Sequence, residues 1–87
     1  MVVLIRHRRF KKAFQKLPSA VRKAVVARLR IFVADPFDPL LENHPLHGEY
    51  AGFRSIRVTG DYRIIYDEIE RGVYVLATIG THSELYE

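Results

Sequence analysis

Residues 53–79 read FRSIRVTGDYRIIYDEIERGVYVLATI, and the rest of the fold can be built outward from them. Three segments of this stretch are rich in the β-branched and aromatic residues that favour strands: 53–58, 62–67 and 73–79. Thr59-Gly60-Asp61 predicts a tight turn between the first two, and residues 68–72 predict a second turn. The stretch therefore predicts a meander of three strands.

Upstream of the meander, the hydrophobic residues repeat with the period of a helix. One apolar stripe recurs at i, i+3, i+4 and i+7: Phe10, Ala13, Phe14 and Leu17. Pro18-Ser19 ends this segment and can start the next. A second stripe follows within residues 19–33: Val21, Val25, Leu29 and Phe32. The two segments predict a helical hairpin.

Two further segments complete the order of elements. Residues 2–5 are apolar and β-branched, which predicts a strand covered on both faces. Residues 34–51 predict a long loop, because Pro36 and Pro39 cannot continue a helix. We therefore expect one α+β domain over residues 1–87, in the order β-α-α-β-β-β. Its two-helix hairpin should pack on a small antiparallel sheet.

Composition limits the classes of function. The chain has 87 residues, 48% of them hydrophobic, which is enough for one core. It has no cysteine, which excludes disulfides, cysteine-based zinc sites and thiol nucleophiles. The apolar start precedes its charges, the reverse of a secretory signal, and no apolar run approaches the roughly 20 residues that span a bilayer. We expect a cytoplasmic protein.

Charge is distributed unevenly along the chain. The first 34 residues hold no acidic residue and carry +10 from ten basic ones: Arg6, Arg8, Arg9, Lys11, Lys12, Lys16, Arg22, Lys23, Arg28 and Arg30. The remaining residues combine four arginines with ten acids and so carry −6, which leaves the net charge of +4. This asymmetry indicates a polyanion or an acidic protein as partner.

Four histidines are candidates for chemistry: His7, His44, His47 and His82. The chain has no HExxH pattern, so we expect no metal site. His7 sits among arginines at a helix start, where a structural role is expected, and His47 is expected to be solvated. His82 follows Gly80-Thr81 at the end of a strand, a position where a scaffold can hold a proton-transfer group.

Four motifs carry a resemblance to a known family. They are HPLxG at residues 44–48, YxGFR at 50–54, DYRIIY at 61–66 and GTHSELY at 80–86. Their order and spacing resemble the YafQ-type branch of the RelE superfamily of toxins, the mRNA interferases. The motifs span about the last half of the chain, whereas the first half agrees only in architecture.

The resemblance implies a RelE-like fold and the toxin of a type II toxin–antitoxin pair. Such toxins enter the ribosomal A site and cut mRNA there as endoribonucleases, with no metal or other cofactor. The expected partners are mRNA on the ribosome, rRNA and a cognate acidic antitoxin. The family's functional residues correspond to His44, Asp61, His82 and Tyr86, and Arg63 is placed against the scissile phosphate.

This chain departs from the family on the first strand of the meander. It has Ser55 and Arg57 where the YafQ-type branch usually carries an acid and a histidine. We therefore expect a hybrid site, in which His82 and His44 transfer protons and two arginines, Arg57 and Arg63, bind phosphate. The arginines can converge only if the strand register permits it.

The remaining roles follow from the same comparison. Asp61 could orient a histidine or act as a base, although aspartate is also common in turns for local reasons. Tyr86 could stack on a base, position the 2′-hydroxyl, or plug the core. We expect Arg54, Lys11 and Lys12 to contact RNA, with an acid as the alternative partner of Arg54.

Two other functions remain open for this sequence. One is a non-nuclease toxin of the ParE type, which inhibits gyrase by binding. Proteins of that type usually lack a histidine at position 82 and the HPLxG segment. The other is a non-catalytic RNA- or partner-binding module, which the basic helices would also suit.

Overall fold

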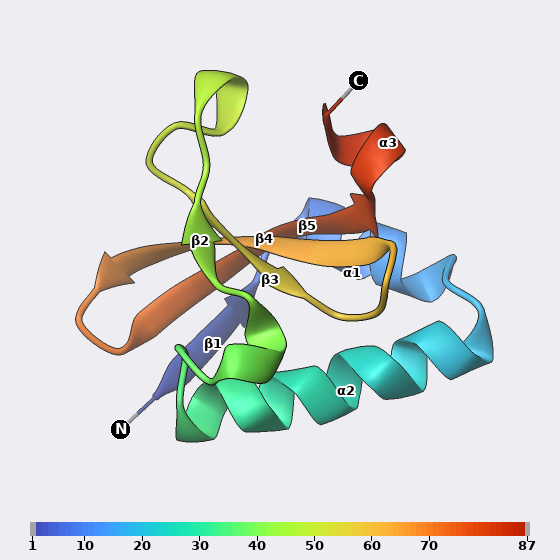
Figure 1. Ribbon diagram of the computed structural model, residues 1–87, viewed down its shortest axis with the longest axis horizontal. Helices are drawn as coiled ribbons and strands as arrows, with labels where there is room; N and C mark the ends of the chain where they lie inside the picture. Colours follow the sequence, from blue (N-terminus) through green and yellow to red (C-terminus); the bar gives the residue numbers. More distant parts are fainter. Residues whose placement is uncertain (1, 87) are drawn as a thin grey trace.

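A five-stranded mixed sheet forms the centre of the computed structural model, which describes residues 2–86 (Figure 1). The strands are β1 (Val3–Arg6), β2 (His44–Pro45), β3 (Arg54–Arg57), β4 (Tyr62–Glu70) and β5 (Val73–Thr81). The helices are α1 (Arg8–Gln15), α2 (Ser19–Ala34) and α3 (His82–Tyr86), with 3₁₀ turns η1 (Pro39–Leu41) and η2 (Gly48–Tyr50). The expected α+β class is confirmed.

The strands lie in the order β1-β5-β4-β3-β2. The meander of β3, β4 and β5 is antiparallel, as predicted. The chain's first strand, β1, pairs in parallel with its last strand, β5. The prediction of an antiparallel sheet is therefore wrong at this edge. Helices α1 and α2 return the chain to the end of the sheet at which β1 begins, so a later strand can run beside β1 in the same direction.

The core lies between one face of the sheet and the two long helices. Phe10 of α1, Leu17 just after α1, and Val25 and Phe32 of α2 are buried, as their stripes predicted. The Phe32 ring makes edge-to-face contacts with the rings of Tyr66 and Tyr74, at centroid distances of 4.9 and 4.8 Å. No helix within residues 2–86 is both long and apolar enough to cross a bilayer.

Strand β1 is more exposed than its composition predicted. Only Leu4 packs against the core, while the side chains of Val3 and Ile5 are 39% and 43% exposed. The prediction of a strand covered on both faces is therefore wrong. β1 is an edge strand, and Val3 and Ile5 alternate with Leu4, so they lie on the sheet face opposite the two long helices.

The predicted loop of residues 34–51 contains more structure than expected. It holds η1, the added strand β2 and η2, and it buries Leu41 and Leu46. Arg28 links this segment to α2 and to the residue after β3. Its guanidinium donates hydrogen bonds to the carbonyl oxygens of Leu40 in the segment and of Val58 after β3, both at 3.1 Å. β2 thus becomes the second edge of the sheet.

Candidate active site

The strand register brings Arg57 and Arg63 together. Their Cα atoms are direct partners in the antiparallel pair of β3 and β4. Directly opposed residues project from the same face of a sheet, and this face is the reverse of the one that packs on α2, because the neighbouring pair Ile56 and Ile64 belongs to the core. The convergence that sequence alone left open is therefore present.

His44 joins the same face from β2. It pairs with Ser55, which lies two residues before Arg57 and so points to the same side. The His44 Nδ1 atom lies 2.9 Å from the carbonyl oxygen of Glu42. A carbonyl only accepts hydrogen bonds, so Nδ1 carries a proton and Nε2 is left to exchange protons with a ligand.

His82 and Tyr86 stand at the other end of this face, on α3. Their ring centroids are 4.8 Å apart, and both residues belong to a helix that rises from the sheet opposite α2 (Figure 1). The His82 backbone N–H donates to the carbonyl oxygen of Asp61 at 3.2 Å, which ties α3 to the turn between β3 and β4. Asp61 is exposed in that turn, beside His82 in space.

A capping box holds α3 in place. The Thr81 backbone N–H donates to Glu84 Oε1 at 2.8 Å, and the Glu84 backbone N–H donates to Thr81 Oγ1 at 3.2 Å. The hydrogen bond from the Thr81 backbone lowers the pKa of Glu84. Gly80 lets the helix fold this closely over the strand, since a Cβ there would lie 3.3 Å from the side chains of Glu84 and Leu85.

Three buried polar atoms near this face have no hydrogen-bond partner within residues 2–86. They are Ser55 Oγ, Arg63 Nη1 and Tyr86 Oη. Folded proteins pair the great majority of such atoms, and the exceptions often have a functional explanation. All three belong to residues that the motifs had singled out, so buried hydrogen-bonding capacity that no described residue uses is gathered near this face.

Glu42 is a site residue that the sequence did not indicate. Its carboxylate pairs with the Arg57 guanidinium, which also donates through Nε to the carbonyl oxygen of Thr59 at 3.1 Å. The hydrogen bond from Arg57 lowers the pKa of the Glu42 carboxyl. Positions 42 and 57 are not related by any sequence periodicity. The pairing of β2 with β3 brings them close together in the fold.

Arg54 lies on the opposite face from the other candidates. It is the partner of the buried Tyr66, donates through Nε to Asn43 Oδ1 at 2.7 Å, and places its guanidinium 5.2 Å from the centre of the Phe37 ring. The expectation that an acid would be its alternative partner is wrong, because an amide and an aromatic ring occupy it. This position does not bring Arg54 to the cluster.

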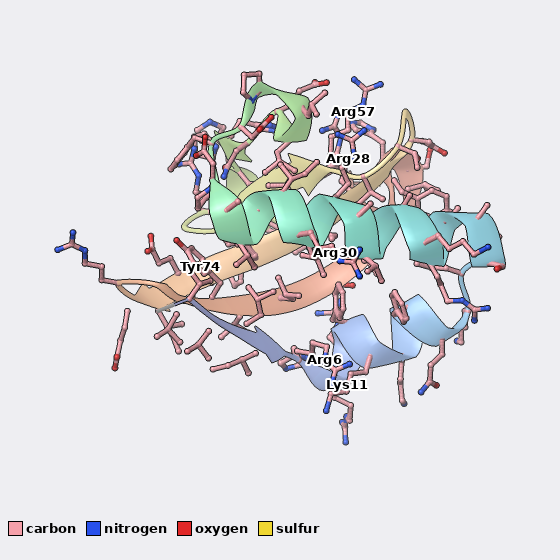
Figure 2. All side chains as sticks on the ribbon, turned by 90° about the horizontal axis from the view of Figure 1, so that it is seen from below. Arg6, Lys11, Arg28, Arg30, Arg57 and Tyr74 are labelled. Carbon is pink, nitrogen blue, oxygen red and sulfur yellow. The ribbon has the colours of Figure 1, made fainter. Side chains whose placement is uncertain are left out.

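The remaining sequence candidates lie elsewhere. His7 caps α1, where its Nδ1 accepts from the Arg9 backbone N–H at 3.0 Å, which confirms its structural role. His47 is exposed just before η2. Lys11 is exposed on α1 and lies far from Arg57 across the molecule (Figure 2).

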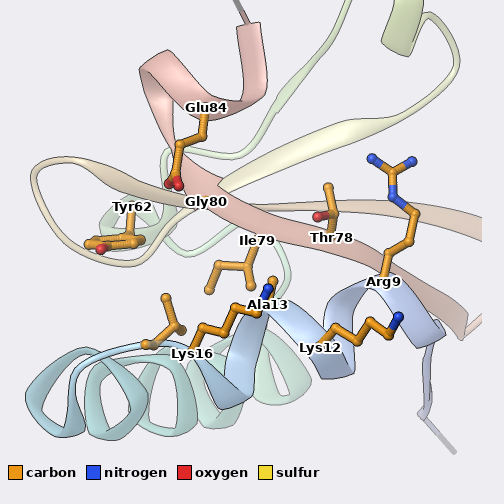
Figure 3. A pocket seen from close by; sticks show the side chains of 10 residues that line it. Arg9, Lys12, Ala13, Lys16, Tyr62, Thr78, Ile79, Gly80 and Glu84 are labelled. Carbon is orange, nitrogen blue, oxygen red and sulfur yellow. The ribbon is translucent and has the colours of Figure 1, made fainter.

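Lys12 lines a basic groove that leads to α3. The groove has a volume of about 390 Å³ and is drawn in Figure 3. Arg9 and Lys12 of α1 and its C-cap residue Lys16 form one side, and Gly80 and Glu84 lie on the other. Within residues 2–86, no cluster of three histidine, aspartate or glutamate side chains could hold a metal ion.

Comparisons with known proteins agree with this architecture. The model of the family described as "bacterial toxin of type II toxin-antitoxin system, YafQ" matches residues 4–87. The crystal structure of YafQ from E. coli strain BL21(DE3) superposes with a TM-score of 0.82 at 16% identity, covering 100% of each chain. A conserved hypothetical protein from Helicobacter pylori is 27% identical, with a TM-score of 0.76 over 99% of this chain and 100% of that one.

The YafQ chain in a crystal structure of the E. coli DinJ–YafQ complex is 20% identical, with a TM-score of 0.73 and 100% coverage of both chains. No curated protein sequence matches the chain. The structural likenesses establish the RelE-like fold, and the family model spans nearly the whole sequence. The chain therefore belongs to the YafQ family of bacterial toxins of type II toxin–antitoxin systems.

Proposed function

We propose that this toxin is an endoribonuclease that cleaves mRNA on the ribosome, in the cytoplasm, without a metal ion or other cofactor. The observation that carries the proposal is the pairing of Arg57 with Arg63 on one face of the sheet. These two strands lie between β2, which carries His44, and β5, which leads into His82. Two permanent positive charges thus lie between two groups that can transfer protons.

The reaction needs three contributions from such a site. A base removes the proton of the 2′-hydroxyl, whose oxygen attacks the phosphorus. The bond from phosphorus to O5′ breaks, and an acid gives the departing O5′ a proton. The products are a 2′,3′-cyclic phosphate and a 5′-hydroxyl, so atoms and protons balance. The pentacoordinate phosphate gains negative charge, which guanidinium groups stabilise without changing their own protonation.

We assign these contributions to named residues. His82 and His44 transfer the two protons, with His44 acting through the Nε2 atom that its contact with Glu42 leaves open. Arg63 and Arg57 bind the phosphate through their guanidinium groups, and the pairing of β3 with β4 places the two residues side by side. Asp61 lies next to His82 and helps to orient it, while Tyr86 packs on the His82 ring.

Basic residues outside the centre extend the RNA surface. Lys12 lines the groove beside α3, and we propose that this groove carries the RNA backbone. Lys11 is exposed on the same helix and would contact rRNA. Arg54, which we had expected to bind RNA directly, would act indirectly, by holding Asn43, the residue that precedes His44 in the chain.

We also propose a cognate acidic antitoxin as protein partner. Two observations support it: E. coli YafQ forms a complex with DinJ, and the first 34 residues of this chain carry +10 with no acid. An acidic antitoxin and rRNA would then use this positive charge in turn.

The test is expression of the chain alone in a bacterial host, combined with primer extension on a message translated in vitro with either untreated toxin or toxin dialysed beforehand against EDTA. We expect growth arrest in the host and new message ends with both toxin preparations. A DNA-supercoiling assay distinguishes the gyrase-inhibiting alternative. Folded protein that inhibits supercoiling, or that leaves translated messages intact, would show the proposal to be wrong.

A further inference from the structure

A second hollow lies beside the candidate active site, between the loop around η2 and helix α3. It has a volume of about 300 Å³ and is lined by His47, Gly48, Glu49, Tyr50, Leu85 and Tyr86. Both walls rise from the face of the sheet that carries Arg57 and Arg63 (Figure 1). Its size matches the lower end of small-ligand pockets.

Aromatic rings give this hollow its shape. The rings of Tyr50 and Tyr86 are perpendicular, with centroids 6.2 Å apart, and Phe53 supports Tyr50 from behind at 6.3 Å. A flat group that stacks on the Tyr50 ring would therefore be perpendicular to the Tyr86 ring and would make an edge-to-face contact with it. Proteins that bind unpaired nucleotides hold bases in this way, with stacking on aromatic side chains and hydrogen bonds to the base edges.

The hollow adjoins the proposed reaction centre. Tyr86 belongs to both, because its ring contacts Tyr50 on the pocket side and His82 on the site side, at 6.2 and 4.8 Å. A nucleotide whose phosphate reaches Arg63 and whose ribose lies near His82 can then place its base between the loop and α3. This position corresponds to a nucleotide beside the scissile phosphate.

The charge of the hollow favours a base over a phosphate. Glu49 is exposed at its wall, and no ion pair within residues 2–86 neutralises its carboxylate. A carboxylate repels phosphate but accepts hydrogen bonds from base N–H groups. Guanine offers N1–H and an amino group side by side, which suit the two carboxylate oxygens, whereas uracil offers a single N–H. The pocket is therefore suited to guanine over uracil.

We propose that the hollow between η2 and α3 is a base-recognition pocket, in which Tyr50 stacks on the base of the nucleotide next to the cut and Glu49 selects guanine by its hydrogen-bond donors. This inference rests on the proposed ribonuclease function and adds to it the residues that set the preference for RNA sequence. Gly48, with φ of 66°, turns the loop so that Glu49 and Tyr50 meet α3.

The first measurement is direct binding of single nucleotides, which requires no cleavage. The chain is titrated with 3′-GMP and 3′-UMP while the NMR signals of the tyrosine rings are followed. We expect 3′-GMP to shift the signals of Tyr50 and Tyr86 and to bind more tightly than 3′-UMP. Tyr50→Ala should weaken 3′-GMP binding about fivefold or more, and Tyr50→Phe should retain it.

The second measurement tests selection by Glu49. Glu49→Gln should reduce the ratio of the 3′-GMP and 3′-UMP affinities about fivefold, and should reduce the preference between messages that differ only at the base beside the cut. Glu70→Gln, another exposed acid but at the far end of β4, is the matched control.

The outcomes separate the pocket from the reaction. The base-recognition proposal is contradicted if neither nucleotide shifts the Tyr50 signals, or if Glu49→Gln keeps the wild-type ratio of affinities. In that case, cleavage of translated messages by the wild type would still support the ribonuclease proposal. If 3′-GMP binds as expected but no translated message is cut, the ribonuclease proposal fails and the pocket stands.

Discussion

The Arg57 guanidinium is already paired in the free protein. Glu42 holds it by an ion pair, and the lowered pKa of Glu42 keeps this carboxylate charged at neutral pH. Because the pKa lies below its ordinary value of 4.5, the pairing is complete above that value and is lost as the pH falls through the lowered pKa. A phosphate that reaches Arg57 must therefore displace Glu42 or bind beside it.

Glu42→Gln should free Arg57 and strengthen RNA binding at neutral pH. Exposed ion pairs are weak, so we expect a modest affinity gain, about 1.5- to 5-fold. Fluorescence anisotropy with a 2′-deoxy-substituted oligonucleotide, which cannot be cut, measures the change. Asp38→Asn lies in the same segment without contacting Arg57 and serves as control. Weaker binding by Glu42→Gln would mean that Glu42 positions Arg57 instead of competing for it.

His82→Ala should abolish most mRNA cleavage and leave the fold intact. The side chain is exposed, so its truncation should change the free energy of unfolding by about 0.5 kcal/mol or less. Loss of a general acid or base typically reduces the rate by a factor of about 10²–10⁴. Primer extension on a translated message measures cleavage, and circular dichroism checks folding.

His7→Ala is the control for this substitution, because His7 is also exposed and caps α1, outside both the arginine cluster and the base-recognition pocket. It should remain toxic. Cleavage by folded His82→Ala at the wild-type rate would leave His44, Asp61 and the arginines to carry the chemistry.

Helix α3 is too short to be stable alone, with five residues from His82 to Tyr86. It depends on the reciprocal hydrogen bonds of Thr81 and Glu84 and on its close approach to Gly80. Because this one turn carries both His82 and Tyr86, its geometry sets two proposed site residues at once. In the proposed reaction, the cap therefore acts as a positioning element.

Glu84→Ala should loosen α3 and lower cleavage without unfolding the protein. Removal of a helix cap costs about 0.5–2 kcal/mol, and misplacement of His82 should reduce the rate about tenfold. The checks are urea denaturation, primer extension and the NMR signals of the His82 and Tyr86 rings. Ser83→Ala is the control, since Ser83 is an exposed residue of the same helix. Equal cleavage by the two variants would show that the cap does not position the site.

The two faces of the sheet differ in their contents: one contains the core, and the other carries the proposed reaction site. One face packs on α1 and α2 and contains the buried aromatic cluster around Phe32. The reverse face carries Arg57 and Arg63 and is partly covered by the η2 loop and α3. Substitutions on the two faces should therefore affect different properties.

Phe32→Ala should destabilise the whole protein by about 3–5 kcal/mol, because Phe32 is fully buried and its loss leaves a cavity. Phe37→Ala is the matched control, because Phe37 is 64% exposed and its ring lies beside the Arg54 guanidinium. Urea denaturation followed by circular dichroism gives the free energies of unfolding. Similar losses for the two variants would contradict the placement of the core.

Local sequence patterns were sufficient to predict most of the elements. The stripes of Phe10 and Leu17 and of Val25 and Phe32 identified both long helices and their buried sides, because helical periodicity lies within a few turns of chain. The three strands of the meander followed from strand-forming residues separated by short turns. The motifs around His44, Asp61 and His82 also identified the family, because they keep their order and spacing along the chain.

Contacts between distant segments could not be predicted in this way. The parallel pairing of β1 with β5, the exposure of Val3 and Ile5, and the ion pair of Glu42 with Arg57 each depend on a partner many residues away. The meeting of Arg57 with Arg63 depends on strand register, and a shift of one residue would turn every side chain of β3 to the other face. The residue types of a segment are enough to predict a strand. Which strands it pairs with, and which of its faces is buried, depend on the distant segments that pack against it in the folded protein.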